Sequence, residues 1–374
     1  MPSWTALGGA PSGSGHRRTP DRGSRRFFVP HVRISEGIAS SPGRTMSSPV
    51  IAARQLSKQF KVPVREAGLA AAARGLFKRT YTTVRAVQSI NFTIESGEIV
   101  GFLGPNGAGK TTTLKMLSGL LYPSSGRAEV LGFQPARRQA DFLRQITLVM
   151  GNRAQLSWDL PAVDSFELQR SIYSLSRPDF EKRRDEFVEM LEVGNLLKKP
   201  IRNLSLGERM KMEIIGSLLH LPRILFLDEP TLGLDVTMQR RIRDFVAEYN
   251  HQYGATVLLT SHYMADVEAL CKRVLVIHNG GLLFDGDLAE LLDRFSVYKT
   301  ISLTLSKGPG SFSQYGEVLQ QEAGHVTLRV RRERTPEITA RLLAEKKVDD
   351  LTVEDPPIED IIEKVFTQTS AEAG

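Results

Sequence analysis

Short apolar runs alternate with helix-like segments along most of the chain, from about residue 49 to residue 295. The runs lack the polar alternation of half-exposed strands, so they predict strands buried on both faces, as in a parallel sheet covered by helices. The predicted strands cover residues 99–103, 146–150, 224–227, 256–260 and 274–277. A helix is expected after the first strand, with one apolar face formed by Leu114, Leu117, Leu120 and Leu121. Asn279 and Gly280 precede another apolar run and predict a tight hairpin that closes this part of the chain.

A different pattern follows the hairpin and predicts a second, smaller domain. Three segments alternate apolar and polar residues, at 301–305, 326–330 and 351–353. Thr335 with Pro336 is a favourable helix start, and Pro357 opens another segment with apolar residues on one helical face. We expect an accessory α+β domain over residues 298–367 with the order β-β-α-β-α, and a tail over residues 368–374.

Composition and charge narrow the class of protein. The first 45 residues contain seven arginines and two acids, so they carry most of the net charge of +7, and the rest is nearly neutral. A nucleic-acid partner is therefore not expected. Residues 1–48 lack periodicity and are predicted to be a disordered extension; the alternative is a translated leader before a natural start at Met46. No run approaches the 18 or so apolar residues of a membrane-spanning helix, and the single cysteine, Cys271, fits a packing role in a reducing compartment.

A glycine-rich segment connects the first predicted strand of the core to its helix. It matches the phosphate-binding pattern G-x-x-x-x-G-K-[ST], in which glycines let backbone N–H groups approach phosphate oxygens at a helix N-terminus. Lys110 would reach the β- and γ-phosphates of ATP, and Thr111 would give its hydroxyl to Mg²⁺. The predicted ATP-binding residues here are Gly104, Pro105, Asn106, Gly107, Ala108, Gly109, Lys110, Thr111 and Thr112.

Two acids end the apolar run 224–227 and provide the second chemical element. Successive side chains of a strand point in opposite directions, so Asp228 and Glu229 are expected to have different roles. Asp228 is predicted to hold Mg²⁺, in part through water. Glu229 is predicted to be the general base that polarises the attacking water.

The segment Leu204 to Glu208 lies between these two elements, about 20 residues before the acidic pair. It resembles the signature motif L-S-G-G-Q of the ATP-binding cassette (ABC) family, with Leu206 for a glycine and Glu208 for the glutamine. Ser205 and Gly207, which in the family contact the γ-phosphate, are kept. The resemblance implies an α/β fold, namely a P-loop NTPase core with a helical subdomain at about 155–215 and an antiparallel β subdomain. We expect this ABC domain over residues 49–297, with the small α+β domain after it.

Other segments fit the same family pattern. Asp235 lies in a stretch that resembles the D-loop, which touches the opposite nucleotide site, and His262 lies where the family places its catalytic switch histidine. Tyr81 resembles the aromatic residue that stacks on adenine, and Phe60 is the alternative. An insertion over residues 62–80 separates them and is either an exposed loop or a basic amphipathic contact with a membrane or partner.

One position departs from the family in a way that affects the metal site. The family has a metal-sensing glutamine after the strand that we assign to residues 146–150. The candidates here are Asn152 and Gln155, and spacing to the Asp-Leu-Pro segment downstream favours Asn152 as the third metal-site residue beside Thr111 and Asp228. Asparagine is shorter by one methylene, so we expect this sensing to be indirect or weaker.

The resemblance implies an ATPase subunit that powers a separate membrane permease. In this family the P-loop of one subunit faces the signature of another, so the expected partners are an integral-membrane permease and a second ABC subunit, forming a homodimer. The signature and the C-terminal region resemble the bacterial multidrug, antibiotic and polysaccharide exporter branch. The expected location is the cytoplasm, on the inner face of the cell membrane through the permease. An importer subunit and a soluble ABC-type mechanochemical ATPase are the alternatives.

Overall fold

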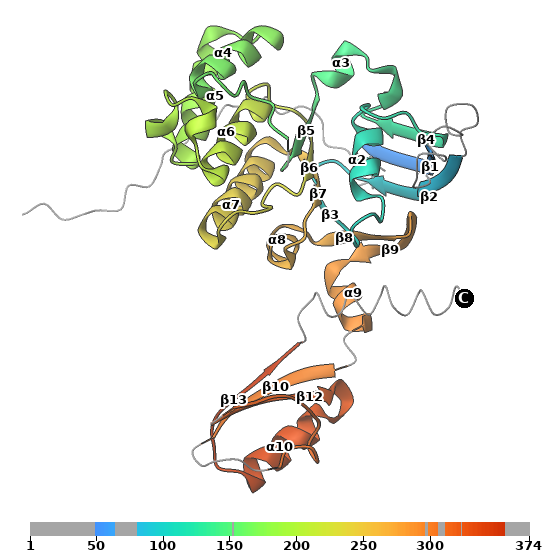
Figure 1. The fold of residues 1–374 in the computed structure, drawn as a ribbon, viewed down its shortest axis with the longest axis vertical. Helices are drawn as coiled ribbons and strands as arrows, with labels where there is room; N and C mark the ends of the chain where they lie inside the picture. Colours follow the sequence, from blue (N-terminus) through green and yellow to red (C-terminus); the bar gives the residue numbers. More distant parts are fainter. Residues whose placement is uncertain are drawn as a thin grey trace, which may run out of the picture. The chain divides into compact units, whose positions relative to one another are not determined.

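A computed structural model describes residues 49–63, 81–151, 153–295, 298–305, 311–322 and 324–355. A six-stranded sheet forms the centre of the larger domain, in the order β5-β6-β7-β3-β8-β9 (Figure 1). The strands are β3 (Ile99–Leu103), β5 (Ile146–Met150), β6 (Ile224–Asp228), β7 (Thr256–Thr260), β8 (Arg273–His278) and β9 (Gly281–Asp287). The first five are parallel, as predicted, and β9 runs antiparallel to β8.

Both faces of this sheet are buried, which explains the continuous apolar runs. Along β6, Leu225 and Leu227 pack on one face against the helices α6 (Leu206–Leu218), α7 (Val236–Tyr253) and α8 (Met264–Leu270). Ile224 and Phe226 pack on the other face, with α2 (Lys110–Leu117) and the antiparallel strands. Figure 1 shows α6 and α7 on one side of the central strands and α2 on the other. Alternate side chains of one strand thus enter two different cores.

Two further parts complete the larger domain. An antiparallel sheet in the order β2-β1-β4 consists of β1 (Ile51–Pro63), β2 (Tyr81–Ile94) and β4 (Ser125–Val130). The predicted helical subdomain contains α4 (Ala162–Ile172) and α5 (Arg177–Met190) and leads into α6. Two short helices lie elsewhere, α3 (Ala140–Leu143) and α9 (Leu288–Phe295).

Turn residues decide where two of these elements end. The predicted hairpin is confirmed: β8 and β9 meet at Asn279 and Gly280, which both have positive φ, as a tight two-residue turn requires. The helix predicted after the P-loop ends one turn early, at Leu117, because Gly119 adopts φ 79° and turns the chain away. Leu120 is consequently exposed instead of lying on the apolar helix face.

The described residues of the smaller domain form an antiparallel sheet of four strands, in the order β11-β12-β10-β13, and the helix α10. Its elements are β10 (Tyr298–Leu305), β11 (Glu317–Glu322), β12 (His325–Arg331), α10 (Thr335–Glu345) and β13 (Val348–Glu354). The expected order missed β11, because this edge strand exposes nearly all its side chains and so lacks apolar alternation. The helix expected from Pro357, the extension over residues 1–48 and most of the insertion lie outside the described residues.

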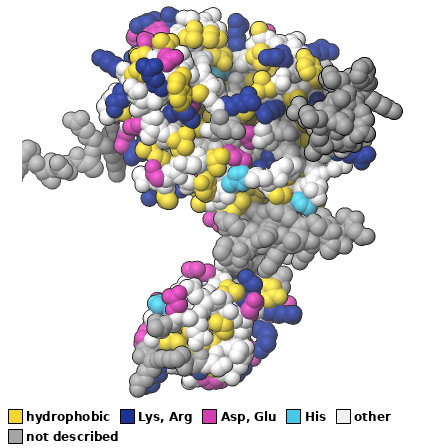
Figure 2. Space-filling model, in the orientation of Figure 1, with side chains coloured by type: hydrophobic (Ala, Val, Ile, Leu, Met, Phe, Trp, Pro, Cys, Tyr) yellow, Lys and Arg dark blue, Asp and Glu magenta, His cyan; other side chains and the backbone are white. Residues whose placement is uncertain are grey.

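None of the helices in the described ranges is both long and apolar enough to cross a bilayer. Basic side chains are spread over the face drawn in Figure 2, with hydrophobic side chains among them. Cys271 is buried, and burial raises the pKa of its thiol to about 12, so its predicted packing role is confirmed.

Candidate functional site

The loop between β3 and α2 can be formed only with glycine at two of its positions. Gly104 has φ 156°, and a Cβ atom there would lie 2.2 Å from the carbonyl oxygen of Ile277. Gly109 has φ 112°, and a Cβ atom would lie 2.4 Å from the carbonyl oxygen of Ala86. The backbone therefore packs directly against two neighbouring strands and leaves its N–H groups at the start of α2, where an anion is favoured.

Lys110 is buried beneath this loop. Its Nζ donates hydrogen bonds to the carbonyl oxygens of Gly104, at 2.5 Å, and Pro105, at 3.1 Å. Burial lowers the pKa of the Lys110 ammonium, while the negative charges of Glu229 and Asp228 act in the opposite direction. The ammonium is thus held by the loop, and the negative charges of the two acids predicted to share its site favour its charged form.

Two of the residues predicted to hold a metal ion, Thr111 at the start of α2 and Asp228 at the end of β6, lie side by side. Thr111 Oγ1 donates to Asp228 Oδ1 at 3.0 Å, and Thr260 Oγ1 donates to the same oxygen at 2.8 Å. A hydroxyl and a carboxylate oxygen are the hard ligands that Mg²⁺ prefers, together with waters and nucleotide phosphates. The donor set therefore fits Mg²⁺. The sequence did not single out Thr260, although it ends a predicted strand next to Asp228.

Glu229 and His262 face each other across the ends of β6 and β7. Glu229 Oε1 lies 2.8 Å from His262 Nε2, and the two side chains are 22% and 33% exposed. The backbone of Glu229 is in the left-handed region at φ 54°, which is costly for a residue other than glycine. The N–H of Glu229 donates to the carbonyl oxygen of Thr260 at 3.0 Å. On the other side, a Cβ atom on Gly151 would lie 2.2 Å from the carbonyl oxygen of Glu229. Tight surroundings on both sides hold this strained residue in place.

The signature segment forms the capped start of α6. Ser205 Oγ accepts a hydrogen bond from the N–H of Glu208, and the Glu208 carboxylate accepts one from the N–H of Ser205 at 2.8 Å. These bonds lower the pKa of Glu208, chiefly through the Ser205 N–H. A Cβ on Gly207 would lie 3.0 Å from Met238 in α7, whose start is capped by Asp235. Among the described residues, no hydrogen bond joins this segment to the P-loop.

The segment that follows β5 is tied to α6 by a residue that sequence reasoning missed. Glu213 is buried and accepts hydrogen bonds from the backbone N–H groups of Gln155, at 2.8 Å, and Leu156. Burial raises the pKa of the Glu213 carboxyl. In the sequence, its position inside an apolar helical stripe was the signal that could have identified Glu213 as a buried acid. Gln155 turns its side chain to the carbonyl oxygen of Leu148, and Asn152 lies outside the described residues.

The two candidate adenine partners lie on opposite faces of the β1–β2 ribbon. Phe60 is opposite Val84, and its ring lies under Lys58, which is opposite Val87. These residues share one face, and Val87 on that face packs beside Gly109 of the P-loop. Tyr81 is opposite Pro63. Pro63 lies three residues after Phe60 on the same strand, so Tyr81 and Pro63 point to the other face. The geometry favours Phe60 as the aromatic residue on the nucleotide side.

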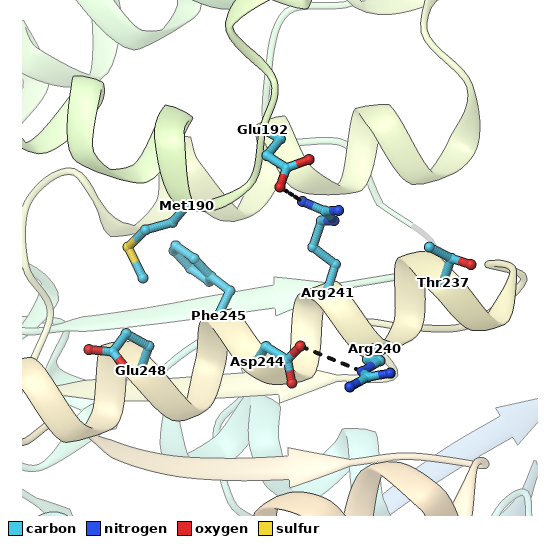
Figure 3. A pocket seen from close by; sticks show the side chains of 8 residues that line it. All are labelled: Met190, Glu192, Thr237, Arg240, Arg241, Asp244, Phe245 and Glu248. Carbon is cyan, nitrogen blue, oxygen red and sulfur yellow. Dashed lines mark ion pairs between the residues drawn. The ribbon is translucent and has the colours of Figure 1, made fainter. Parts of the chain in front are cut away.

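A cavity of ≈ 610 Å³ lies away from these residues, between the end of α5 and α7 (Figure 3). Its floor includes Phe245, and the Arg241–Glu192 ion pair, at 2.5 Å, crosses its edge. The Glu192 carboxylate is thereby held in its charged form, because its hydrogen bond with Arg241 lowers its pKa. The pair fastens α7 to the helical subdomain and contributes nothing to the phosphate site.

Comparison with known proteins identifies the family. The family model described as "ABC transporter" matches residues 87–232. The ATP-binding protein NatA of Bacillus subtilis is 34% identical over 217 residues, which is 58% of this chain and 88% of NatA. The chain belongs to the ABC transporter family. It is an ATP-binding and ATP-hydrolysing subunit of an ABC transporter.

Further matches place this ABC subunit among drug-related relatives. The linearmycin resistance protein LnrL of B. subtilis is 34% identical, covering 61% of this chain and 73% of LnrL. The bacitracin transport protein BcrA of Bacillus licheniformis is 31% identical, covering 60% and 72%. A second family model, described as "EvrA-like ABC transporter, C-terminal domain", matches residues 288–354.

Solved structures support the same fold for the ABC domain. The structure of an ATP-binding subunit of an ABC transporter matches with a TM-score of 0.54 and 25% identity, covering 66% of this chain and 93% of that one. A post-hydrolysis dimer of the cassette MJ0796 with ADP and Pi has a TM-score of 0.54 and 22% identity, covering 64% and 98%. The predicted fold class is confirmed.

Proposed function

We propose that this subunit hydrolyses Mg²⁺-bound ATP in a site shared by two copies and thereby drives an exporter at the membrane. The observation that carries the proposal is the convergence of Lys110, the Thr111–Asp228 oxygens and the Glu229–His262 pair at neighbouring strand ends. The P-loop glycines would place backbone N–H groups on the β- and γ-phosphates, and Phe60 would stack on the adenine. Tyr81 remains the alternative for this stacking contact.

Each residue of the site has a distinct part in hydrolysis. Thr111 and Asp228 would hold Mg²⁺, which supplies charge neutralisation for the triphosphate when bound. Glu229 would take a proton from the attacking water, and His262 would hold Glu229 in position and contact the γ-phosphate. Lys110 would exchange its two carbonyl contacts for phosphate oxygens. Asn152 stays a predicted metal-sensing residue.

A second copy would complete the site. Ser205, Gly207 and Asp235 lie at the starts of α6 and α7, where free backbone N–H groups favour an anion. No hydrogen bond among the described residues brings them to the P-loop of their own chain, which supports a role on the opposite nucleotide. ATP would then act as an adhesive between two copies, and hydrolysis would release them.

The names of relatives and an exposed apolar surface both support a role in export. The relatives include resistance proteins for linearmycin, daunorubicin and doxorubicin and a bacitracin transport protein, so amphiphilic antibiotics are the proposed class of cargo. Several large apolar side chains of the helical subdomain are exposed, among them Trp158, Leu160, Leu168 and Ile172. Such a group of apolar residues is suited to a permease contact, which would keep the subunit on the inner face of the membrane.

Replacement of this apolar surface tests the partnership with a permease. Leu168→Glu combined with Ile172→Glu places two charges on the exposed face of α4, and we expect the chain to lose its co-purification with a multi-spanning membrane protein. Binding of ATP in solution should stay within about twofold of wild type, because neither side chain touches the phosphate site. Leu343→Glu, at an equally exposed leucine of α10, is the matched control and should still co-purify. Unchanged membrane co-purification of the α4 variant would contradict the proposed surface.

A further inference from the structure

A buried carboxylate lies behind the catalytic pair without touching it. Asp266 in α8 is fully buried, and its Oδ2 accepts hydrogen bonds from the hydroxyls of Thr231, at 2.5 Å, and Ser261, at 2.8 Å. Its Oδ1 accepts a hydrogen bond from Arg243 of α7 at 2.8 Å. Both hydroxyl residues are almost completely buried as well. A cavity of only ≈ 10 Å³ remains beside the cluster, so its members are close-packed.

The two hydroxyl partners of Asp266 belong to the loops that carry the catalytic residues. Thr231 lies two residues after Glu229, and Ser261 directly precedes His262. The Thr231 side chain anchors the turn in which the strained Glu229 backbone sits, and the carbonyl oxygen of Glu229 accepts a hydrogen bond from Leu232 in the same turn. A strained residue keeps its conformation only where its surroundings fix it more than once.

We infer that Asp266 is a positioning residue, which holds Thr231 and Ser261 at one carboxylate oxygen and thereby keeps Glu229 and His262 within hydrogen-bond distance. The inference rests on the proposed roles of Glu229 and His262. Arg243 balances the buried charge and allows both hydroxyls to converge on the other oxygen. The cluster connects β6, β7, α7 and α8, so it fixes the two catalytic loops relative to each other instead of fixing either one alone.

Removal of the two hydroxyls tests the inference, because replacing Asp266 itself would leave Arg243 buried without its partner and destabilise the fold. Thr231→Val removes the hydroxyl and keeps the shape of the side chain. Ser261→Ala removes the hydroxyl from the other loop. Each variant should lower kcat about tenfold, while the Kd for a non-hydrolysable ATP analogue changes by less than about twofold. Combined, the two should lower kcat by little more than either alone, because both hydroxyls act through the same oxygen.

Two matched variants separate positioning from a general loss of stability. Thr231→Ser keeps the hydroxyl and should restore most of the activity that Thr231→Val loses. Ser217→Ala removes another buried hydroxyl, which donates to the carbonyl oxygen of Ile214 in α6, and should leave kcat unchanged. A fall in kcat for both serine-to-alanine variants, or a parallel loss of kcat and nucleotide binding, would overturn the inference.

Glu229→Gln, measured in parallel, distinguishes failure of the inference from failure of the proposed function. If this variant hydrolyses ATP normally, the role of Glu229 is wrong and the inference falls with it. If it stops turnover while Thr231→Val and Ser261→Ala keep wild-type kcat, only the positioning role of Asp266 is overturned. A multiplicative loss in the combined variant, about a hundredfold, would also overturn it, because the hydroxyls would then act independently.

Discussion

At the phosphate site, close contacts restrict which residue type can occupy individual positions. A side chain at Gly104 or Gly109 would collide with a carbonyl oxygen of a neighbouring strand. Lys110 donates hydrogen bonds to two carbonyl oxygens of the loop, and it would exchange them for phosphate oxygens when ATP binds. The adenine side is less constrained. Phe60 is 37% exposed and Tyr81 52% exposed, on opposite faces of one ribbon, so only one of them can be the stacking partner from its own chain.

Substitution of these two aromatic residues decides between them. Phe60→Ala should weaken ATP binding about tenfold, because a base–aromatic stacking contact contributes about 1–3 kcal/mol. Tyr81→Ala should change it by less than about twofold. The Kd of each variant for a fluorescent ATP analogue is the measurement, and Phe60→Tyr is the control that keeps an aromatic ring. A larger loss for Tyr81→Ala than for Phe60→Ala would show that our assignment of the nucleotide-facing side is wrong.

The sequence was sufficient where the chemistry is contiguous and insufficient where it is assembled from distant segments. The P-loop and the Asp228–Glu229 pair follow buried strands directly, so the apolar pattern located them. Glu213 and Asp266 escaped prediction because their partners are up to 58 residues away and their importance depends on burial. The ribbon face of Phe60 depends on a strand register that residue spacing does not reveal.

Among the helices, α6 connects the signature segment to strand β5 of the core sheet. Its first turn carries Ser205, and Glu213 in its middle holds the segment after β5. Just beyond its end, His220 stacks on Tyr173 with ring centroids 3.8 Å apart, and its Nε2 lies 3.3 Å from the carbonyl oxygen of Ile146 in β5. The helix is therefore in contact with both ends of the strand that leads to the predicted metal-sensing residue.

His220 gives this joint a pH dependence. Burial lowers its pKa from 6.5 to about 4, so below pH 6.5 the unfolded chain binds a proton that the folded chain does not. Stability should therefore fall as the pH drops from 6.5 to 4, by on the order of 3 kcal/mol from this residue. His220→Phe should lose less stability than wild type between pH 7 and pH 4.5, measured by urea unfolding. Tyr173→Phe keeps the stacked ring and should follow wild type; an equal loss in His220→Phe would contradict the argument.

In the whole molecule, the described residues of one chain form no hydrogen bond between the signature segment and the P-loop. The P-loop, the metal oxygens and the catalytic pair lie together, whereas the signature residues contact α7 of their own chain. ATP can shift two copies from apart to together only if it binds the closed pair much more tightly than the separate chains. In the proposed function, hydrolysis would remove that difference in affinity and let the two copies separate.

The oligomeric state of Glu229→Gln with and without nucleotide tests this claim most directly. Light scattering after size-exclusion chromatography should give the mass of a monomer without ATP and of a dimer with ATP and Mg²⁺, and the bound ATP should stay unhydrolysed. Glu248→Gln, an exposed acid of α7, is the matched control and should turn ATP over normally. A variant that binds ATP but keeps the mass of a monomer at saturating nucleotide would contradict the shared site.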